Sequence, residues 1–367
     1  MTKSPIRQHF ALGTVFLLGG NLLVGSSYRA AQDSWISALV AAALLIVWGL
    51  LLWRISRLAP QKGIVALLDL FPVPVRNALT VAVGIYCLSQ SSLILRAYAG
   101  FAHTVSLQRT DEFFLIVLSC AVVFVFVKGE KRILLRFSYL ALIPILLTVA
   151  LLFFFLIPHF RWELLFPMFY ENTSNVILCT AEDFSYPFGN AFLLLGLYSR
   201  HEDRGKEGAL WLTSCASAGL VSFLIVVQNI LLLGGKLCAS LECPNNFAAS
   251  IVNVGDFFSR VEVVASLVFY LSAIVRVSLF MRTAADALGV LTPVSKKEAA
   301  FPLTLLLLGH SAVLFQNTES LFHYLRIFPM LALPFQLGLP LSIWLILEFR
   351  VRRRSQVGTR RPHSILL

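Results

Sequence analysis

Long apolar stretches alternate with short polar links along the whole chain. Each stretch holds roughly 18 residues or more with few charges, which is enough to cross a lipid bilayer as a helix. Because backbone polar groups in lipid must be satisfied within the segment, the pattern predicts an all-α integral membrane protein with ten transmembrane helices. The predicted crossings are 10–28, 34–54, 78–104, 112–128, 138–158, 181–199, 210–235, 257–285, 300–317 and 327–348.

The lysines and arginines are concentrated in alternate links. Of the 30 basic residues, 22 lie towards one side of the predicted crossings, in or next to the N-terminal segment, every second link and the C-terminal tail. Six lie towards the other side, in or next to the intervening links, and Arg96 and Arg276 lie deep within crossings. Cytoplasmic loops of membrane proteins carry such an excess of positive charge. The distribution therefore predicts an even number of crossings, with both termini cytoplasmic.

The composition lies outside the range of soluble proteins, at 58% hydrophobic and 13% charged residues with a mean hydropathy of +0.80. We therefore expect a single polytopic membrane domain over residues 1–367, ending in a basic cytoplasmic tail at 349–367. The net charge of +11 lies in short loops and the tail. Membrane topology and contact with the lipid bilayer explain charge placed there, so no nucleic-acid binding is expected.

The sequence contains no pattern typical of catalysis. No link exceeds roughly 25 residues, which leaves no room for a soluble catalytic domain. Since no nucleophile–base set, phosphate loop or metal-ligand spacing occurs, we expect no enzyme activity, no catalytic residues, no cofactor and no metal site. Cys238 and Cys243 lie in a predicted outer loop, where a disulfide and two free thiols are equally compatible with the sequence.

Ten crossings divide into two halves of five, at 1–158 and 181–348, and an odd-numbered half places the second half upside down relative to the first. Transporters built from such inverted repeats bind solute near the midplane, where one helix of each half is interrupted. Residues 19–21 (Gly-Gly-Asn) and 187–190 (Pro-Phe-Gly-Asn) lie in the first and sixth crossings. Small residues also serve helix packing. Their corresponding positions favour non-helical backbone and a binding site.

Two segments carry a resemblance to a known family. Residues 253–262 (Asn-Val-Gly-Asp-Phe-Phe-Ser-Arg-Val-Glu) are similar to a "gdFxxRxE" motif before the eighth helix, and residues 32–36 (Gln-Asp-Ser-Trp-Ile) to an "xDxWI" motif opening the second. The chain resembles, over essentially its whole length, the B-subunit family of spore germinant receptors, which are spore permeases within the amino acid-polyamine-organocation superfamily. It departs at Gly25-Ser26, where the family commonly has proline, and at Asn190, where the family commonly has glutamate.

The resemblance implies a five-plus-five inverted repeat of leucine-transporter type, located in the spore inner membrane. It implies assembly with receptor A and C subunits, and binding of a small nutrient germinant, often an amino acid, that triggers germination. An amino-acid or polyamine secondary transporter of the same superfamily, and a structural subunit with a vestigial pocket, are the alternatives. The ligand-binding residues that the resemblance implies are Gly19, Gly20, Asn21, Tyr86, Phe188, Gly189, Asn190, Val275 and Arg276.

Individual charged residues add expectations of their own. Arg276 lies past the middle of the eighth crossing and is expected to contact a ligand carboxylate or to form part of a gate. Arg96 is compatible both with a side chain that reaches the membrane boundary and with a functional role. Glu182 and Asp183 are predicted to cap the start of the sixth crossing, and Asp33 that of the second. No carboxylate is expected at the bilayer centre, which argues against proton coupling.

Overall fold

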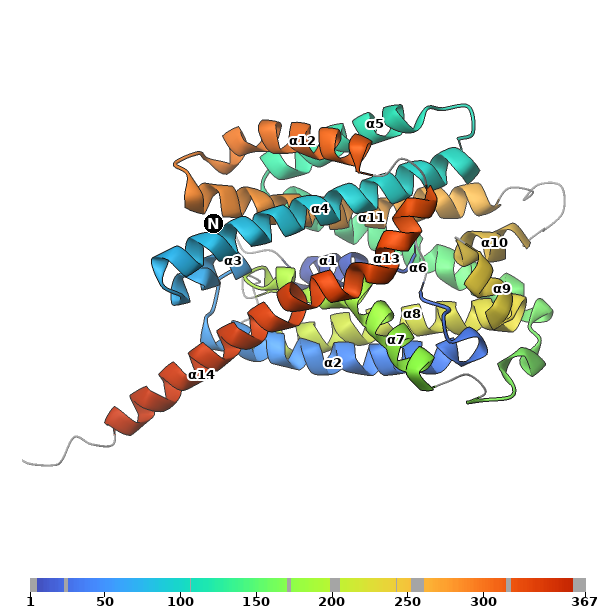
Figure 1. The fold of residues 1–367 in the computed structure, drawn as a ribbon, viewed down its shortest axis with the longest axis horizontal. Coiled ribbons are helices and arrows are strands. Elements are labelled where there is room, and N and C mark those ends of the chain that lie inside the picture. Colours follow the sequence, from blue (N-terminus) through green and yellow to red (C-terminus); the bar gives the residue numbers. More distant parts are fainter. Residues whose placement is uncertain are drawn as a thin grey trace, which may run out of the picture.

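The computed structural model describes residues 5–22, 26–105, 107–169, 173–198, 205–241, 243–251, 261–314 and 318–358, and all regular structure within them is helical. The longer helices run along one axis of an elongated bundle (Figure 1). The α-helices are α1 (Ile6–Leu18), α2 (Ser34–Leu58), α3 (Ile64–Leu67), α4 (Val73–Val105), α5 (Glu112–Lys128), α6 (Lys131–Leu156), α7 (Thr173–Asp183), α8 (Glu207–Leu233), α9 (Gly235–Ser240), α10 (Pro244–Ile251), α11 (Val261–Leu291), α12 (Lys296–Val313), α13 (Thr318–Leu333) and α14 (Leu339–Gly358).

The backbone leaves α-helical geometry within the sixth and tenth predicted crossings. A π-helix, Phe184–Phe188, follows α7 directly, and a 3₁₀-helix, Gly189–Leu194, follows the π-helix. A second π-helix, Pro334–Gly338, joins α13 to α14. Both π-helices contain a proline, which lacks the backbone N–H that an α-helix needs at that position. Such wide turns are frequent at functional sites.

Six helices in the described part of the chain are long and apolar enough to cross a membrane, and they match predicted crossings two, three, five, seven, eight and ten. The first and sixth predicted crossings are instead interrupted, and α1 and α7 have only 13 and 11 residues. The fourth and ninth coincide with the shorter helices α5 and α12. Each predicted crossing thus contains helical structure, and the count of ten crossings stays a prediction. The six spans are Ala31–Leu58, Val73–Thr104, Lys131–His159, Glu207–Leu233, Val263–Leu291 and Ile327–Arg353.

Equivalent members of the two predicted halves pack against each other. The most extensive contacts in the bundle join α4 to α11 and α2 to α8, followed by those between α5 and α12. These pairs are the third and eighth, second and seventh, and fourth and ninth predicted crossings. Two inverted halves that face one another would produce this pairing, although the division of the chain into halves at 1–158 and 181–348 stays a prediction.

One face of the outer helices is apolar and exposed. In α6, Leu140, Ile143, Leu147 and Phe154 are each more than half exposed, whereas Ser138, Ala141 and Ile145 on the opposite face are buried. The exposed residues recur at helical spacing and form one stripe. Large apolar side chains in such a stripe are expected to face lipid rather than water.

Helix α1 lies at the centre of the bundle, and all its residues from Ala11 to Leu18 are buried. It packs against α6, α8 and α11. The start of α1 and the far end of α14 lie at one end of the bundle, called here the terminal end, whereas α9 and α10 lie at the opposite end (Figure 1). This arrangement places the first interruption, directly after Leu18, inside the protein.

Candidate functional site

The first interruption occurs where the sequence predicts it. Helix α1 ends at Leu18, and residues 19–22 form a turn in which the Leu22 N–H donates to the Leu18 carbonyl oxygen at 3.1 Å. The Asn21 carbonyl oxygen leaves the helical pattern and accepts a bond of 2.6 Å from Asn245 Nδ2 of α10. Asn21 is buried, and its Oδ1 has no hydrogen-bond partner among the described residues. The expected break in α-helix is therefore confirmed in the first crossing.

The second interruption differs from the expectation of non-helical backbone. Residues 184–194 stay helical, but they change from α to π and then to 3₁₀ geometry. Pro187 lies in the π-helix, where the wider turn accommodates its missing N–H. Asn190 Nδ2 donates to the carbonyl oxygen of Tyr186 at 3.2 Å. The prediction of non-helical backbone is therefore wrong at this position, although the carbonyl oxygens of Ser185 and Tyr186 accept bonds from other segments.

A buried polar network connects the second interruption to α4 and to the second π-helix. The Tyr86 hydroxyl of α4 donates to Asn190 Oδ1 at 2.6 Å and accepts from Gln336 Nε2 at 3.1 Å. Gln336 Nε2 also donates to the Ser185 carbonyl oxygen at 2.7 Å, and the Ser185 hydroxyl donates to Gln336 Oε1 at 2.8 Å. All four side chains are buried. Buried networks of this kind fix geometry because a broken bond leaves a desolvated partner behind.

Arg276 of α11 is fully buried between the two interruptions. Its guanidinium donates to the Tyr186 carbonyl oxygen, and Nη1 donates to the Phe16 carbonyl oxygen at 3.4 Å. The guanidinium carbon lies 5.2 Å from the ring centre of Tyr186, 5.4 Å from that of Phe16 and 5.8 Å from that of Phe280. In the described part of the chain Arg276 pairs with no carboxylate, and its Nε has no hydrogen-bond partner. The site therefore holds a buried cation with at least one N–H group that donates to no partner in the described structure.

Glycines allow the interrupted segments to touch. A Cβ atom on Gly20 would lie 2.9 Å from Arg276 Nη1 and 3.0 Å from Pro187 Cβ, and one on Gly19 would lie 3.0 Å from the Ser272 carbonyl oxygen. A Cβ atom on Gly189 would overlap the side-chain amide of Gln336. The absence of a side chain at these positions is thus required for the close approach seen here.

The structure brings most of the predicted ligand-binding residues together. Gly20 lies against Arg276, and Tyr86 bonds directly to Asn190. Phe188 and Val275 are buried in the core and supply no side-chain polar group. The predicted set thus contains one cation and one amide–phenol pair. Its role in binding a ligand stays a prediction.

Several site residues are missing from the sequence prediction. Gln336 is central to the network, and Asn229 of α8 donates to the Tyr28 hydroxyl at 2.8 Å and to Asn245 Oδ1 at 2.6 Å. Each is an amide within or beside an apolar stretch, where a polar side chain needs a partner. A polar amide in an apolar stretch, the signal that indicated Asn21 and Asn190, could therefore also have indicated Gln336, Asn229 and Asn245.

The predicted helix caps are wrong. Helix α7 begins at Thr173, so Glu182 and Asp183 end it rather than begin it. Asp33 precedes α2 but makes no capping bond, and its Oδ1 accepts from the Phe169 N–H at 2.9 Å. In each case the carboxylate bonds to a distant segment instead of to its own helix.

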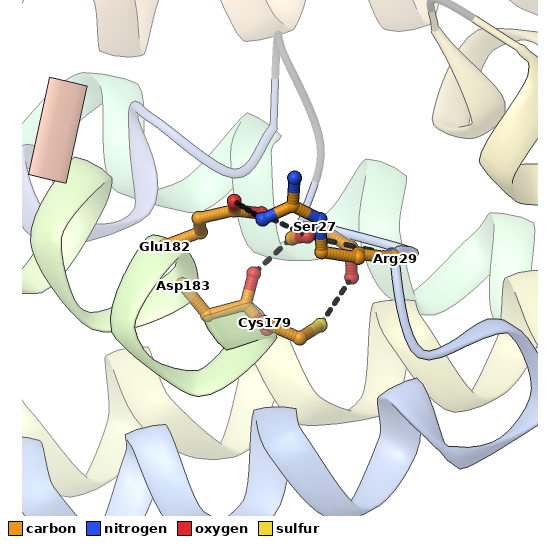
Figure 2. A network of polar contacts seen from close by, with 5 residues as sticks. All are labelled: Ser27, Arg29, Cys179, Glu182 and Asp183. Atoms are coloured by element: carbon orange, nitrogen blue, oxygen red, sulfur yellow. Dashed lines mark hydrogen bonds and ion pairs between the residues drawn. The ribbon is translucent and has the colours of Figure 1, made fainter. Parts of the chain in front are cut away.

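Glu182 and Asp183 instead join α7 to the segment after the first interruption (Figure 2). The Ser27 N–H donates to Asp183 Oδ1 at 2.7 Å, and the Ser27 hydroxyl donates to Glu182 Oε2 at 2.5 Å. Arg29 Nη1 pairs with Glu182 Oε1 at 3.0 Å, and the Cys179 thiol donates to the Ser27 carbonyl oxygen at 3.0 Å. We call these five residues the Ser27 cluster. It joins the first and sixth predicted crossings on the side away from the terminal end.

A cavity of about 1220 Å³ lies on the other side of the interruptions. Its wall includes His9 and Leu12 of α1, Gly196 beyond the 3₁₀-helix, and Arg282 and Asp286 of α11. It also includes the start of α3 and the turn between α5 and α6. Hydrogen bonds thus join the two segments at the Ser27 cluster, whereas a cavity lies towards the terminal end.

The structure bears on the Cys238–Cys243 disulfide and on the role of Arg96, but it does not describe most of the motif at residues 253–262. The Cys238 thiol is buried and donates to the Asn229 carbonyl oxygen at 3.4 Å, so it forms no disulfide with Cys243. Arg96 pairs with Glu112, which favours a structural role that ties α4 to α5. Gly25 and residues 253–260 lie outside the described residues.

Neutralising the Arg96–Glu112 pair is expected to lower stability without changing any ligand response. The pair is partly buried, and such pairs contribute on the order of 1 kcal/mol. Thermal unfolding of Arg96→Gln, Glu112→Gln and the double variant should show that the two losses are not additive. A nutrient response that changes in Arg96→Gln but not in Glu112→Gln would instead indicate a functional role for Arg96.

Comparison with known proteins agrees with this geometry. The model of the family described as spore germination protein matches residues 4–320. The chain is 24% identical over 367 residues to spore germination protein KB of Bacillus subtilis (strain 168), covering 96% of this chain and 97% of that protein. It is also similar to the solved structure of MhsT in complex with L-phenylalanine, with a TM-score of 0.59 and 16% identity, covering 93% of this chain and 87% of that chain.

The likeness to MhsT, at this level of identity, concerns the fold alone, and it supports the leucine-transporter type implied by the sequence. The six long apolar helices make the chain an integral membrane protein. The family match covers most of the chain, and the relative is similar over nearly its full length. The chain therefore belongs to the spore germination protein family, whose members are of receptor or permease type rather than enzymes.

Proposed function

We propose that the chain is the B-type membrane subunit of a spore nutrient-germinant receptor. In this proposal it lies in the spore inner membrane with both termini in the cytoplasm and assembles with A and C subunits. A small nutrient, such as an amino acid, binds between the two interrupted segments and triggers germination. Family membership supports the role in germination, and the site supports the chemistry of the ligand.

The observation that carries this proposal is the buried cation Arg276. A guanidinium without a charged partner is costly in a membrane interior, and carboxylates are its best partners because they accept two parallel hydrogen bonds. Amino-acid nutrients bring such a carboxylate. MhsT, which shares the fold, was solved in complex with the amino acid L-phenylalanine. A ligand carboxylate at Arg276 would complete the pairing that the described residues leave open.

Ligand entry requires the segments around Arg276 to separate. Gly20 packs closely against Pro187 and Arg276, since an added Cβ on Gly20 would crowd both of these residues. The ligand would replace this contact with its own atoms. The turn at residues 19–22 and the π-helix are segments whose backbone can change shape at low cost, because neither has a complete α-helical ladder.

A transporter of amino acids or polyamines is the second candidate. The cavity of about 1220 Å³ favours it, because it lies between the site and the terminal end, whereas hydrogen bonds of the Ser27 cluster join the two interrupted segments on the other side. Alternating access between two sides is the requirement for transport. A receptor needs the ligand-induced change alone, so the two candidates differ in whether solute crosses the membrane.

Binding is tested by thermal unfolding of the purified protein in the presence of single amino acids. A ligand that binds the native state at a hundred times its Kd stabilises it by about 2.7 kcal/mol. We expect at least one amino acid to raise the unfolding temperature, and the shift to disappear in Arg276→Met. Polyamines, which have no carboxylate, serve as the chemical control. An absence of any shift over the full amino-acid panel would point to a vestigial pocket.

Transport is tested by uptake of the stabilising amino acid, in radiolabelled form, into proteoliposomes. The receptor proposal expects binding without accumulation inside the vesicles. Accumulation above that of empty liposomes, with loss in Arg276→Met, would support the transporter instead. Spores that carry the Arg276→Met variant then show whether the same site governs germination.

A further inference from the structure

One carboxylic acid is buried where the two interrupted segments meet. Asp183 is only 3% exposed, and it ends α7 directly before the first π-helix. Its Oδ1 accepts the Ser27 N–H at 2.7 Å, whereas its Oδ2 is buried and has no hydrogen-bond partner in the described part of the chain (Figure 2). Buried polar atoms without a partner are rare in native proteins, and each needs an explanation.

The charges around Asp183 do not compensate it. Within α7 its neighbours are Glu182, which is also acidic, and the Cys179 thiol. The segment after the first interruption presents Tyr28 and Arg29, but Arg29 pairs with Glu182 rather than with Asp183. An ionised Asp183 would therefore be a buried anion with one hydrogen bond and an acidic neighbour.

The other elements packed against α7 add no cation among the residues whose side chains the structure describes, which do not include those of His323 and Arg326 on α13. Helix α2 bonds to α7 through the Ser37 hydroxyl, which donates to the Val176 carbonyl oxygen at 3.1 Å. Its charged residues, Arg54 and Arg57, lie at the far end of the helix, and Arg54 pairs with Glu348. On α13 the described titratable side chain is Tyr324, which packs on the ring of Phe328.

We propose that Asp183 is a proton-binding site that links protonation to closure of the Ser27 cluster. With the cluster closed, Asp183 is neutral and carries a proton on Oδ2, while Oδ1 accepts the Ser27 N–H. When the segment around Ser27 separates from α7, water reaches the carboxyl group and the proton leaves to water. Closure therefore takes up one proton per chain, and opening releases it. This inference depends on burial and geometry and is independent of the identity of any nutrient.

The sign of the pH effect follows from this balance. A buried carboxylate without a cation is costly, so the closed arrangement is favoured where Asp183 is protonated. Rising pH makes the proton harder to retain and favours the open arrangement. The ratio of open to closed molecules is then expected to rise by up to roughly tenfold per pH unit over the range in which the open form has released the proton and the closed form still holds it.

Cys179 provides a reporter within the same cluster. Its side chain is fully buried, and its thiol donates to the Ser27 carbonyl oxygen, so a maleimide reaches it only after the Ser27 segment has moved. The rate of N-ethylmaleimide addition at Cys179 is measured by peptide mass spectrometry on the purified full-length chain in detergent micelles, over a range of pH. The other cysteines need not be replaced, because the peptide containing Cys179 is quantified separately.

The decisive comparison is with Asp183→Asn. The amide keeps an oxygen for the Ser27 N–H but cannot release a proton. Both proteins contain the same thiol, so the ordinary increase of thiol reactivity with pH cancels in the ratio of their rates. We expect the rate of the unsubstituted protein relative to that of Asp183→Asn to rise with pH, by up to roughly tenfold per unit while most molecules are closed, and to level off once most are open. Glu182→Gln, which leaves Asp183 intact, should retain the pH dependence.

Parallel pH profiles for the unsubstituted protein and Asp183→Asn would overturn the proposal. If Asp183→Asn does not accumulate, Asp183→Ser gives the same comparison, because it is also neutral. If neither variant accumulates, infrared spectra of the unsubstituted protein decide the matter. A protonated carboxyl band that disappears with the same midpoint as the gain in Cys179 labelling supports the proposal, and the absence of such a band overturns it.

Discussion

Replacing Gly20 with leucine is expected to raise the nutrient concentration needed for half-maximal germination by about five- to a hundredfold. The structure gives the reason: a Cβ at this position already lies 2.9 Å from Arg276 Nη1 and 3.0 Å from Pro187 Cβ. Adding a whole side chain to a close-packed site costs roughly 1–3 kcal/mol, which corresponds to that range of affinity. Dose–response curves of spores that carry the variant measure the effect.

Gly309→Leu is the matched control for this substitution. Gly309 lies in helix α12, and outside the neighbouring backbone of its own helix no atom lies within 4 Å of the position that its Cβ would take. The control should leave both membrane abundance and the dose–response curve unchanged. A Gly20→Leu protein with normal abundance and a normal curve would refute the binding site. A fall in abundance alone would show that Gly20 serves only to pack the bundle.

Replacing Arg276 with methionine is expected to have the larger effect, because it removes the fully buried cation between the interruptions. Truncating one partner of a buried hydrogen-bonded charge pair costs about 2–5 kcal/mol, or roughly thirty- to several thousandfold in affinity. The protein itself should tolerate the change, since an apolar side chain of similar length avoids the cost of a buried cation. Arg276→Lys retains the charge but not the paired donors, so its ligand affinity should fall between those of the unsubstituted protein and Arg276→Met.

Arg282→Met provides the control for Arg276. Arg282 belongs to the same helix, but its Nη1 donates to the carbonyl oxygens of Phe126 and Gly129, at 2.5 and 2.9 Å, and so caps the end of α5. Its loss should lower the unfolding temperature and leave the ligand response unchanged. Equal ligand-response losses in the two variants would mean that Arg276 acts through stability rather than through contact with a nutrient. Thermal unfolding and germination curves for both variants separate these outcomes.

The sequence predicted the all-helical membrane class and the first interruption because both depend on local chemistry. Apolar length determines whether a helix can span lipid, and consecutive glycines weaken a helix wherever it lies. The second interruption was located correctly but its geometry was not. Pro187 excludes one α-helical hydrogen bond, and whether the chain then unwinds or widens into a π-helix depends on neighbours such as Gln336, which come from elsewhere in the sequence.

The positions of the acidic residues were the least predictable. The predicted sixth crossing starts at 181, which places Asp183 at a membrane boundary, whereas α7 starts at Thr173 and carries Asp183 into the interior. This burial is within the protein, and the expectation that no carboxylate lies at the bilayer centre stays a prediction. Ser27, which supplies the partner N–H, is more than 150 residues away in sequence. Pairings over such separations follow from the packing of the whole bundle, and no local pattern encodes them.

The contact between Gln336 and Ser185 has a mechanical consequence for α14. This helix begins directly after the second π-helix and extends away from the bundle at the terminal end (Figure 1). Its 20 residues form a rod of about 30 Å, so a tilt of about 10° at Gly338 would displace its far end by about 5 Å. Arg54 of α2 holds Glu348 partway along the rod at 3.1 Å. A small shift of Gln336 at the site would thus become a larger displacement of α14 at the terminal end. That displacement would either break the Arg54–Glu348 ion pair or move α2 together with α14.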